Sequence, residues 1–258
     1  MAAGDGVATA LAASATLVAS AFCLLTLDRW MRRRTPHDLA WSIAMALFAV
    51  GSVSLWWAES RGWSSASFRI FFLTGAVLNV PWLALGTVYL LFGRRTGDIV
   101  RTALVVLSGY ATGVVTTASM RTQVPSDEFP TAKELFGVAP RVLAGVGSGV
   151  PAVVIIVGAL WSAARVARGR VPAATGSARR SASSPRMLGL GNVLIAVGAI
   201  VLSASGTLAG RLGKDAAFAV TLLVGIVILF AGFVVASNAV GARPRISAEI
   251  AAALSPSH

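Results

Sequence analysis

Seven apolar runs, each about twenty residues long, divide this sequence and limit what it can fold into. A run of this length crosses the ~30 Å hydrocarbon core of a bilayer as a single α-helix. Within lipid every backbone polar group must be hydrogen-bonded inside the protein, which favours helices for such runs. We therefore predict an all-α membrane protein with seven transmembrane helices, at residues 7–27, 39–57, 70–92, 102–120, 142–164, 188–209 and 217–239.

The charged residues fit a membrane protein better than a soluble one. They make up 12% of the chain, whereas soluble domains carry roughly 25%. The net charge of +12 resembles a nucleic-acid signal, but the basic residues occur in short groups between apolar runs. This pattern is typical of loops at an anionic lipid surface. We expect the lipid bilayer, with anionic lipids at its cytoplasmic face, as the partner, and no nucleic acid.

The distribution of basic residues predicts the orientation, because Lys and Arg in short loops favour the cytoplasm. With the N-terminus outside and the C-terminus cytoplasmic, the inner segments hold fifteen of the 22 basic residues and the outer segments seven. No basic residue precedes the first apolar run, so we expect that run to remain as a span and not to be a cleaved signal peptide. Arginine supplies all but two of the basic residues, a bias that we attribute to a high-GC bacterial genome. We therefore expect a multi-pass protein of the bacterial cytoplasmic membrane.

Loops and tails leave no room for a separate soluble domain, so residues 1–258 form one transmembrane domain. The basic loop 165–187 and the short tail 240–258 are assigned to the cytoplasm. The proline-containing external loop is expected to form a short helix around Ala132–Val138. The basic loop also holds serines after paired arginines, and the sequence leaves their phosphorylation undecided. They are Ser181, Ser183 and Ser184.

The predicted spans lack the ionisable residues that membrane transport or catalysis commonly uses. No Asp, Glu, Lys, Arg or His lies in the central part of any predicted span, although such residues mark ion and proton pathways. A single cysteine, Cys23, excludes an intrachain disulfide and a cysteine metal site, and we expect it to be a small buried residue. His37 is expected to lie at the start of a helix. We expect no metal, no cofactor and no enzymatic activity.

Two irregular helices offer the best candidate for a binding cavity. The third run carries Asn79, Pro81 and Trp82 near its middle, and the fifth carries Ser148 and Pro151 in a glycine-rich stretch at a similar depth. Proline removes a backbone donor and frees a carbonyl, which in lipid must be satisfied by a neighbour or by water. The two helices either line a central cavity or pack closely. We favour packing, with Asn79 as the first site candidate.

Glycines spaced by four favour close approach between membrane helices. We interpret them as packing sites within the chain before sites of oligomerisation. The pairs are Gly109/Gly113, Gly145/Gly149 and Gly206/Gly210.

A second group of polar residues lies at the predicted outer face. Glu59 and Arg61 end the second run, and Arg69 begins the third. They can form an exterior ion pair or contact a polar ligand, but we favour a solvated loop pair.

Two stretches carry a resemblance to known proteins. RIFFLTGAVLNVPWLALGTVYLL from Arg69, with KELFGVAPRVLAGVGSG from Lys133, resembles a group of uncharacterised seven-helix membrane proteins of high-GC bacteria. More weakly, LFAVGSVSLWWAES, followed by FRIFF and PWL, is similar to the seven-helix sensory module of some bacterial histidine kinases. The first resemblance implies no established activity, and the second implies a sensory role.

Two functions remain open from the sequence. The first is a non-catalytic sensor, scaffold or accessory subunit with a membrane protein partner. The alternative is a carrier of a neutral small molecule through a cavity near the prolines of the third and fifth helices. Surface chemistry using Glu59 and the acidic residues of the external loop ranks third.

Overall fold

Two long helices joined by a tight turn begin the chain. In the computed structural model, which describes residues 3–126, 129–168, 185–212 and 215–241, α1 covers Ala3–Arg33 and α2 covers Pro36–Arg61. Pro36 occupies the first turn of α2, where its missing N–H would have no helical partner anyway. α1 turns a narrow face of small residues toward the protein, at Ala8, Ala12, Ala15 and Ala19. Their small side chains allow α1 to pack closely.

The third rod (residues 65–92) consists of three helical segments. Gly62, with φ of +90°, ends α2, and Ser64 then caps α3, which covers Ser65–Phe71. The Ser64 hydroxyl accepts from the Ser67 amide at 3.2 Å, and the Ser67 hydroxyl accepts from the Ser64 amide at 2.9 Å. A π-helix, η1, follows at Phe72–Leu78, and α4 covers Asn79–Thr117. The first part of α4 completes the third rod.

Gly93 reverses the chain within α4. It has φ of 82° and ψ of −178°, a left-handed conformation that favours glycine. Across this break, the Trp82 Nε1 donates to the Ser108 Oγ at 3.3 Å. A continuous helix would place these residues about 39 Å apart. The returning helix (residues 94–117) therefore lies antiparallel against the third rod.

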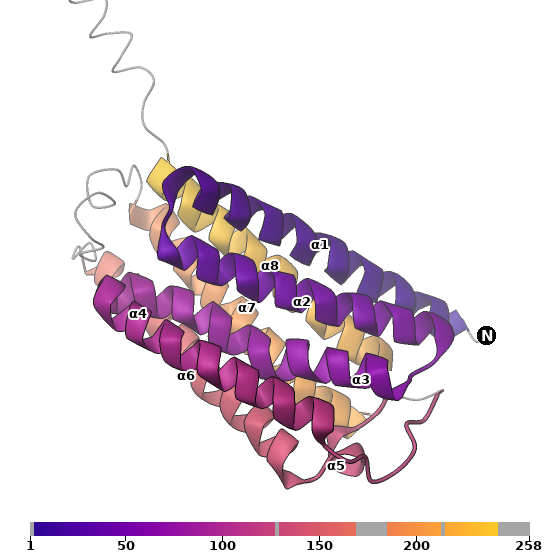
Figure 1. Cartoon of the computed structure of the whole chain (residues 1–258). Coiled ribbons are helices and arrows are strands. Elements are labelled where there is room, and N and C mark those ends of the chain that lie inside the picture. Colours follow the sequence, from indigo (N-terminus) through magenta and orange to yellow (C-terminus); the bar gives the residue numbers. More distant parts are fainter. Residues whose placement is uncertain (1–2, 127–128, 169–184, 213–214, 242–258) are drawn as a thin grey trace, which may run out of the picture.

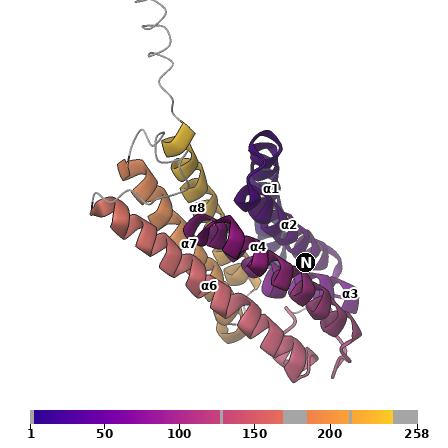
Figure 2. The ribbon, with the colours of Figure 1, turned by 60° about the vertical axis from the view of Figure 1, so that its left-hand side comes forward.

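The remaining helices complete a closed series of neighbours. They are α5 at Ala132–Leu135, α6 at Val138–Ala167, α7 at Pro185–Leu212 and α8 at Asp215–Gly241. Each of α1, α2, α4, α6, α7 and α8 contacts the next, and α8 contacts α1. Figure 1 shows the long helices side by side in one bundle, and Figure 2 shows α6, α7 and α8 on the side away from α1 and α2.

Glycines join α7 and α8 at very short range. A Cβ built on Gly198 would lie 2.6 Å from the Leu229 amide nitrogen, and one on Gly232 would lie 2.7 Å from the Ile195 nitrogen. Gly191 similarly faces the backbone of Ala236 and Gly232. The two helices are thus packed backbone to backbone, as small residues permit in membranes.

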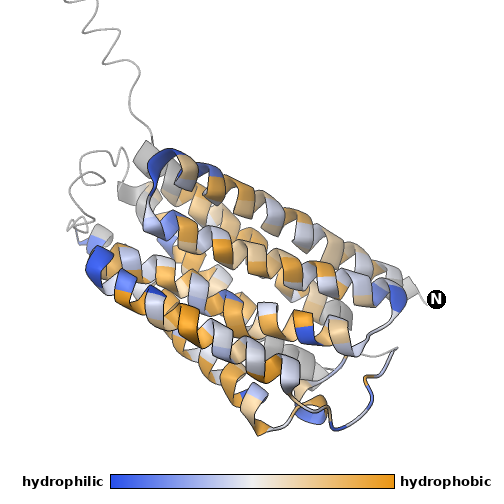
Figure 3. Ribbon diagram, in the orientation of Figure 1, coloured by the Kyte–Doolittle hydropathy of each residue, from blue (hydrophilic) through white to orange (hydrophobic). Residues whose placement is uncertain are grey.

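The structure confirms the all-α prediction for the described residues, in which the isolated bridge between Met120 and Phe136 is the only β-type pairing. Five helical stretches are long and apolar enough to cross a membrane, as expected for a multi-pass membrane protein. They are Gly6–Arg33, Pro36–Arg61, Ser65–Thr117, Val138–Arg165 and Phe218–Ala236, with a shorter apolar stretch at Gly189–Leu202. Figure 3 shows hydrophobic residues along the rods and the hydrophilic ones mainly toward the bundle's ends.

Two predicted boundaries were wrong. Residues 118–120, placed in the fourth span, are not helical, because Ala118 leaves the helical region with ψ of 129° and Met120 enters the bridge. The short external helix was expected to continue to Val138, but it ends at Leu135 because Phe136 is extended in the same bridge.

Several sequence predictions fall outside the described residues. These are the conformation of most of the basic loop with its three serines, and that of nearly all of the tail. The acidic pair Asp127 and Glu128 of the external loop also lies outside them.

Candidate functional site

The π-helix and Pro81 leave the backbone of the third rod short of hydrogen-bond donors. The Asn79 amide donates to the carbonyl of Thr74, five residues back. Where the hydrogen-bond spacing returns from five residues to the four of an α-helix, one carbonyl receives no helical N–H. Pro81 has no N–H, so it removes one further donor. The carbonyl that an N–H at position 81 would serve in an α-helix is that of Val77. π-helical turns of this kind occur frequently at functional sites.

Gly147 of α6 lies against this freed carbonyl. A Cβ built on Gly147 would be 3.0 Å from the Val77 oxygen, so a larger residue would push the two backbones apart by a few tenths of an ångström. A Cα–H of α6 can therefore serve as a weak donor to the carbonyl. At this level the irregularities of the third and fifth runs meet in a close contact, which favours the packing interpretation over an open channel.

The cavity candidates divide into residues with their own partners and one without. Trp82 donates to Ser108 at 3.3 Å, and the Ser148 hydroxyl donates to the carbonyl of Ala144 at 2.6 Å. Pro81 and Pro151 are half-buried within their helices. Trp82 and Ser148 therefore form their hydrogen bonds with different helices, and their polar groups do not converge on one binding site.

Asn79 differs from the other candidates. Its side chain belongs to a residue that is only 6% exposed, and its Oδ1 has no hydrogen-bond partner among the described residues. Leaving such an acceptor buried and unpaired costs about 1–3 kcal/mol. The residues on both sides of it in the chain, Leu78 and Val80, pack into hydrophobic clusters. Asn79 is thus a polar group within an apolar region of the third rod.

The outer-face candidates have distinct partners. The Arg69 guanidinium donates to the carbonyls of Val115, Thr116 and Ala118, with distances of 3.1 Å to Thr116 and 2.7 Å to Ala118. These carbonyls end the returning helix and have no helical donor. Arg69 therefore fastens that helix to α3, and it is not a freely solvated loop residue.

Arg61 and Glu59 lie at the end of α2. The Arg61 guanidinium carbon is 4.1 Å from the centroid of the Trp57 ring, a cation–π contact within α2. Glu59 is half-buried near the end of the same helix. No contact among the described residues joins Arg61 to Arg69 in one ligand-binding set.

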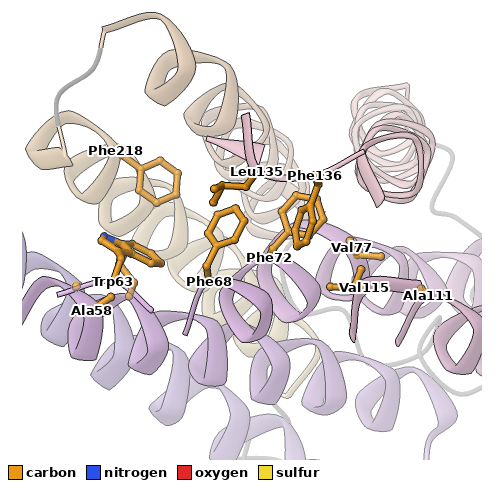
Figure 4. Packing of buried hydrophobic residues seen from close by; sticks show 12 residues of the cluster. Ala58, Trp63, Phe68, Phe72, Val77, Ala111, Val115, Leu135, Phe136 and Phe218 are labelled. Carbon is orange, nitrogen blue, oxygen red and sulfur yellow. The ribbon is translucent and has the colours of Figure 1, made fainter. Parts of the chain in front are cut away.

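An aromatic cluster beneath the segment that joins α4 to α6 was not predicted. Phe136, just after α5, packs on Phe68 and Phe72 with ring centroids 5.4 and 5.0 Å apart. Figure 4 shows these three rings together. Trp63 and Phe218 belong to the same hydrophobic cluster. The sequence held these residues in separate segments, and only the docking of the loop onto α3 and α8 brings them together.

A buried ion pair at the other end of the bundle was also missed. Asp38 is fully buried, with an oxygen 3.5 Å from the Arg29 Nε. The Thr35 hydroxyl donates to the second oxygen of Asp38, and the His37 Nε2 is 3.9 Å from that oxygen. The position of His37 at the start of α2 agrees with the sequence prediction.

This ion pair connects three helices. The Arg29 guanidinium carbon of α1 lies 4.9 Å from the centroid of the Phe233 ring of α8, and Trp41 of α2 packs edge-on against the same ring at 5.3 Å. The sequence signal for this site was an acidic residue three positions after Thr35, in the first turn of a helix. It was overlooked because Asp38 lies just outside the predicted span.

The predicted glycine packing was wrong for two of the three pairs, and the third, Gly206/Gly210, lies outside the residues whose packing is described. Gly109, Gly113, Gly145 and Gly149 are exposed, and a Cβ on any of them would meet nothing within 4 Å.

Cys23 is partly buried as a free thiol, and its sulfur lies 3.4 Å from the Ser42 carbonyl.

Metal ligands do not gather in the described part of the chain, where no group of three or more His, Cys, Asp or Glu residues could hold an ion. No known protein-family model matches the chain, and no curated protein matches it significantly.

Proposed function

We propose that the chain is a seven-span protein of the bacterial cytoplasmic membrane, with its N-terminus outside and its C-terminus in the cytoplasm. The reversal at Gly93 supports two crossings within Ser65–Thr117. The excess of basic residues in alternate loops supports the orientation. The resemblance to seven-helix proteins of high-GC bacteria agrees with this assignment.

Within that membrane the proposed role is a non-catalytic sensor, scaffold or accessory subunit that binds a transmembrane helix of a partner protein. One observation carries this proposal: Gly109 and Gly113 form an open notch on the outward face of the returning helix, where a Cβ built on either glycine would meet no neighbouring helix of the described structure within 4 Å. Such notches let a second helix approach closely, and close packing is a main source of helix association in lipid.

Side chains beside the notch suit a helix better than lipid alone. The returning helix is buried along a single narrow line of residues, at Gly97, Leu104, Ala111 and Val115. Its exposed side carries Thr112, Thr116 and Tyr110. Hydroxyl groups form hydrogen bonds between membrane helices. Those of Thr112 and Thr116 already donate to carbonyls of their own helix, so toward a partner they act as acceptors. A partner helix would gain both the notch and these hydroxyls.

The experiment places a photo-crosslinking amino acid at Val106, which is 68% exposed on the same helix. Crosslinking in intact cells should trap a distinct partner protein, which mass spectrometry identifies. Gly113→Leu should abolish this product, because the leucine side chain fills the notch, where a built Cβ meets no neighbouring helix within 4 Å. Gly149→Leu is the matched control, since its site on α6 is equally open, and the product should persist.

The outcomes separate the alternatives. A product containing only a second copy of this chain would replace the partner protein with a homo-oligomer. A product that survives Gly113→Leu would contradict the notch as the contact. Turnover of a substrate by the purified chain alone would contradict the non-catalytic role.

A second candidate function, carriage of a neutral small molecule, is favoured by the unpartnered Oδ1 of Asn79. Transport requires a path past the contact between Gly147 and Val77. Uptake of a neutral solute into proteoliposomes, lost in Asn79→Leu, would support the carrier over the subunit.

A further inference from the structure

The side chain of Asn79 presents a buried acceptor whose partner is not supplied by the nearby polar groups of the chain. The Thr74 hydroxyl donates to the carbonyl of Ile70 at 2.8 Å. Trp82 Nε1 donates to Ser108, and the Ser148 hydroxyl donates to Ala144. Each of these donors already has an acceptor within its own helix or the neighbouring one. The Oδ1 of Asn79 has none among the described residues.

Backbone geometry adds acceptors at the same place. The Asn79 amide donates to the Thr74 carbonyl, five residues back in the chain, and Pro81 has no amide hydrogen. The carbonyls of residues 75–77 therefore outnumber the intrahelical donors that reach them. The Val77 carbonyl faces Gly147, whose Cα–H is only a weak donor. The Asn79 side-chain oxygen and these carbonyls thus belong to residues 75–79, about one turn of the third rod.

We propose that Asn79, with the carbonyls of the turn before Pro81, binds a small neutral hydrogen-bond donor. Buried polar groups of native proteins are paired, commonly by an internal water that makes two to four hydrogen bonds. The donor is neutral because amide and carbonyl oxygens carry no formal charge to offset a cation in an apolar region. Water and the hydroxyl or amide of a small solute share this chemistry.

If the bound donor is a solute, it would be the molecule that the proposed subunit senses. Only in that case does the inference rest on the proposed function. A π-helix is a suitable place for such a site, because the binding of a donor offsets the hydrogen bonds that the π turn and Pro81 leave unmade. Occupation of the site would therefore stabilise the π form of the third rod.

The experiment compares the thermal unfolding of the full chain in lipid nanodiscs with that of Asn79→Leu. If a donor is bound, the leucine variant loses it and leaves backbone carbonyls unpaired, and the Tm should fall by on the order of 2–10 °C. If Oδ1 has no partner, replacing it with a similar apolar side chain should raise the Tm. Ser148→Ala is the control, since its hydroxyl is bonded within its own helix.

Two further measurements distinguish the source of the donor. A high-resolution structure of the wild-type chain should show density within hydrogen-bonding distance of Oδ1. A single peak identifies water. A Tm that rises with added acetamide or ethylene glycol, in the wild type but not in Asn79→Leu, identifies a solute. Both results support the site, whereas a raised Tm in Asn79→Leu together with absent density overturns it. The crosslinking at Gly113 is unaffected by either result, so the two proposals fail separately.

Discussion

Alanine at Gly198 should destabilise the bundle, whereas alanine at Gly149 should not. Both glycines lie inside long helices, so both substitutions gain the same helix propensity, about 0.5–1 kcal/mol. At Gly198 the new methyl carbon would lie 2.6 Å from the Leu229 amide nitrogen and 2.8 Å from its Cβ. At Gly149 it would meet nothing within 4 Å. The difference between the two variants isolates the steric contact between α7 and α8.

The magnitude follows from those distances. Ordinary contact begins near 3.4 Å, so the backbones of α7 and α8 must separate by about 0.8 Å at Gly198. No side-chain rotation relieves the contact, because the opposing atoms are backbone and Cβ. Overpacking of this kind costs about 1–3 kcal/mol. For a chain of this size, each kcal/mol corresponds to about 2–4 °C, which predicts a Tm difference of about 2–12 °C between the variants.

Thermal unfolding of both variants in the same detergent measures the difference. Leu229→Ala provides an internal check, because it shortens the side chain but leaves the opposing amide and Cβ in place. Combined with Gly198→Ala, it should not restore the lost stability. Equal Tm values for Gly198→Ala and Gly149→Ala, or rescue by Leu229→Ala, would refute backbone-to-backbone packing at this site.

Three other predictions test the two ends of the bundle and its orientation. Arg29→Met should cost about 3–5 kcal/mol in thermal unfolding, because the fully buried Asp38 loses its cationic partner. Asp38→Asn should cost less, because the Arg29 side chain is 21% exposed, and replacing both by apolar residues should recover most of the Arg29→Met loss. Arg69→Gln should cost about 1.5–3 kcal/mol and increase hydrogen exchange at the end of the returning helix, since its last carbonyls lose a charged donor; unchanged exchange would show that this capping is unimportant. In intact cells and a cysteine-free background, an impermeant maleimide should label Asp127→Cys but not Ser183→Cys, and the reverse pattern would mean that a span has been miscounted.

Helix type and approximate position were predictable because they depend on local composition. The apolar runs and their polar flanks specify long helices, and Thr35 with Pro36 marks the start of α2. The predicted short helix in the external loop was also found, although it is shorter. Asn79 and Pro81 could be selected as candidates because a polar group beside a proline is costly in an apolar helix.

The role of each glycine could not be predicted in the same way. Gly109 and Gly147 occur in similar sequences, yet the first is open to the outside and the second faces the Val77 carbonyl. A glycine has no side chain whose polarity would indicate its direction. Only the rotation of each helix about its axis decides which glycines are buried.

The sequence by itself thus determined that this chain forms apolar helices, where they run, and which polar groups would be expensive inside them. These properties depend on residues that are close together in the chain. Tertiary structure alone decided that Arg29 pairs with Asp38 and Phe233, that Arg69 caps the returning helix, and that the Asn79 Oδ1 has no partner among the described residues. Each of these depends on how helices distant in sequence are packed and rotated, because a side chain's partners are set by the few ångströms around it.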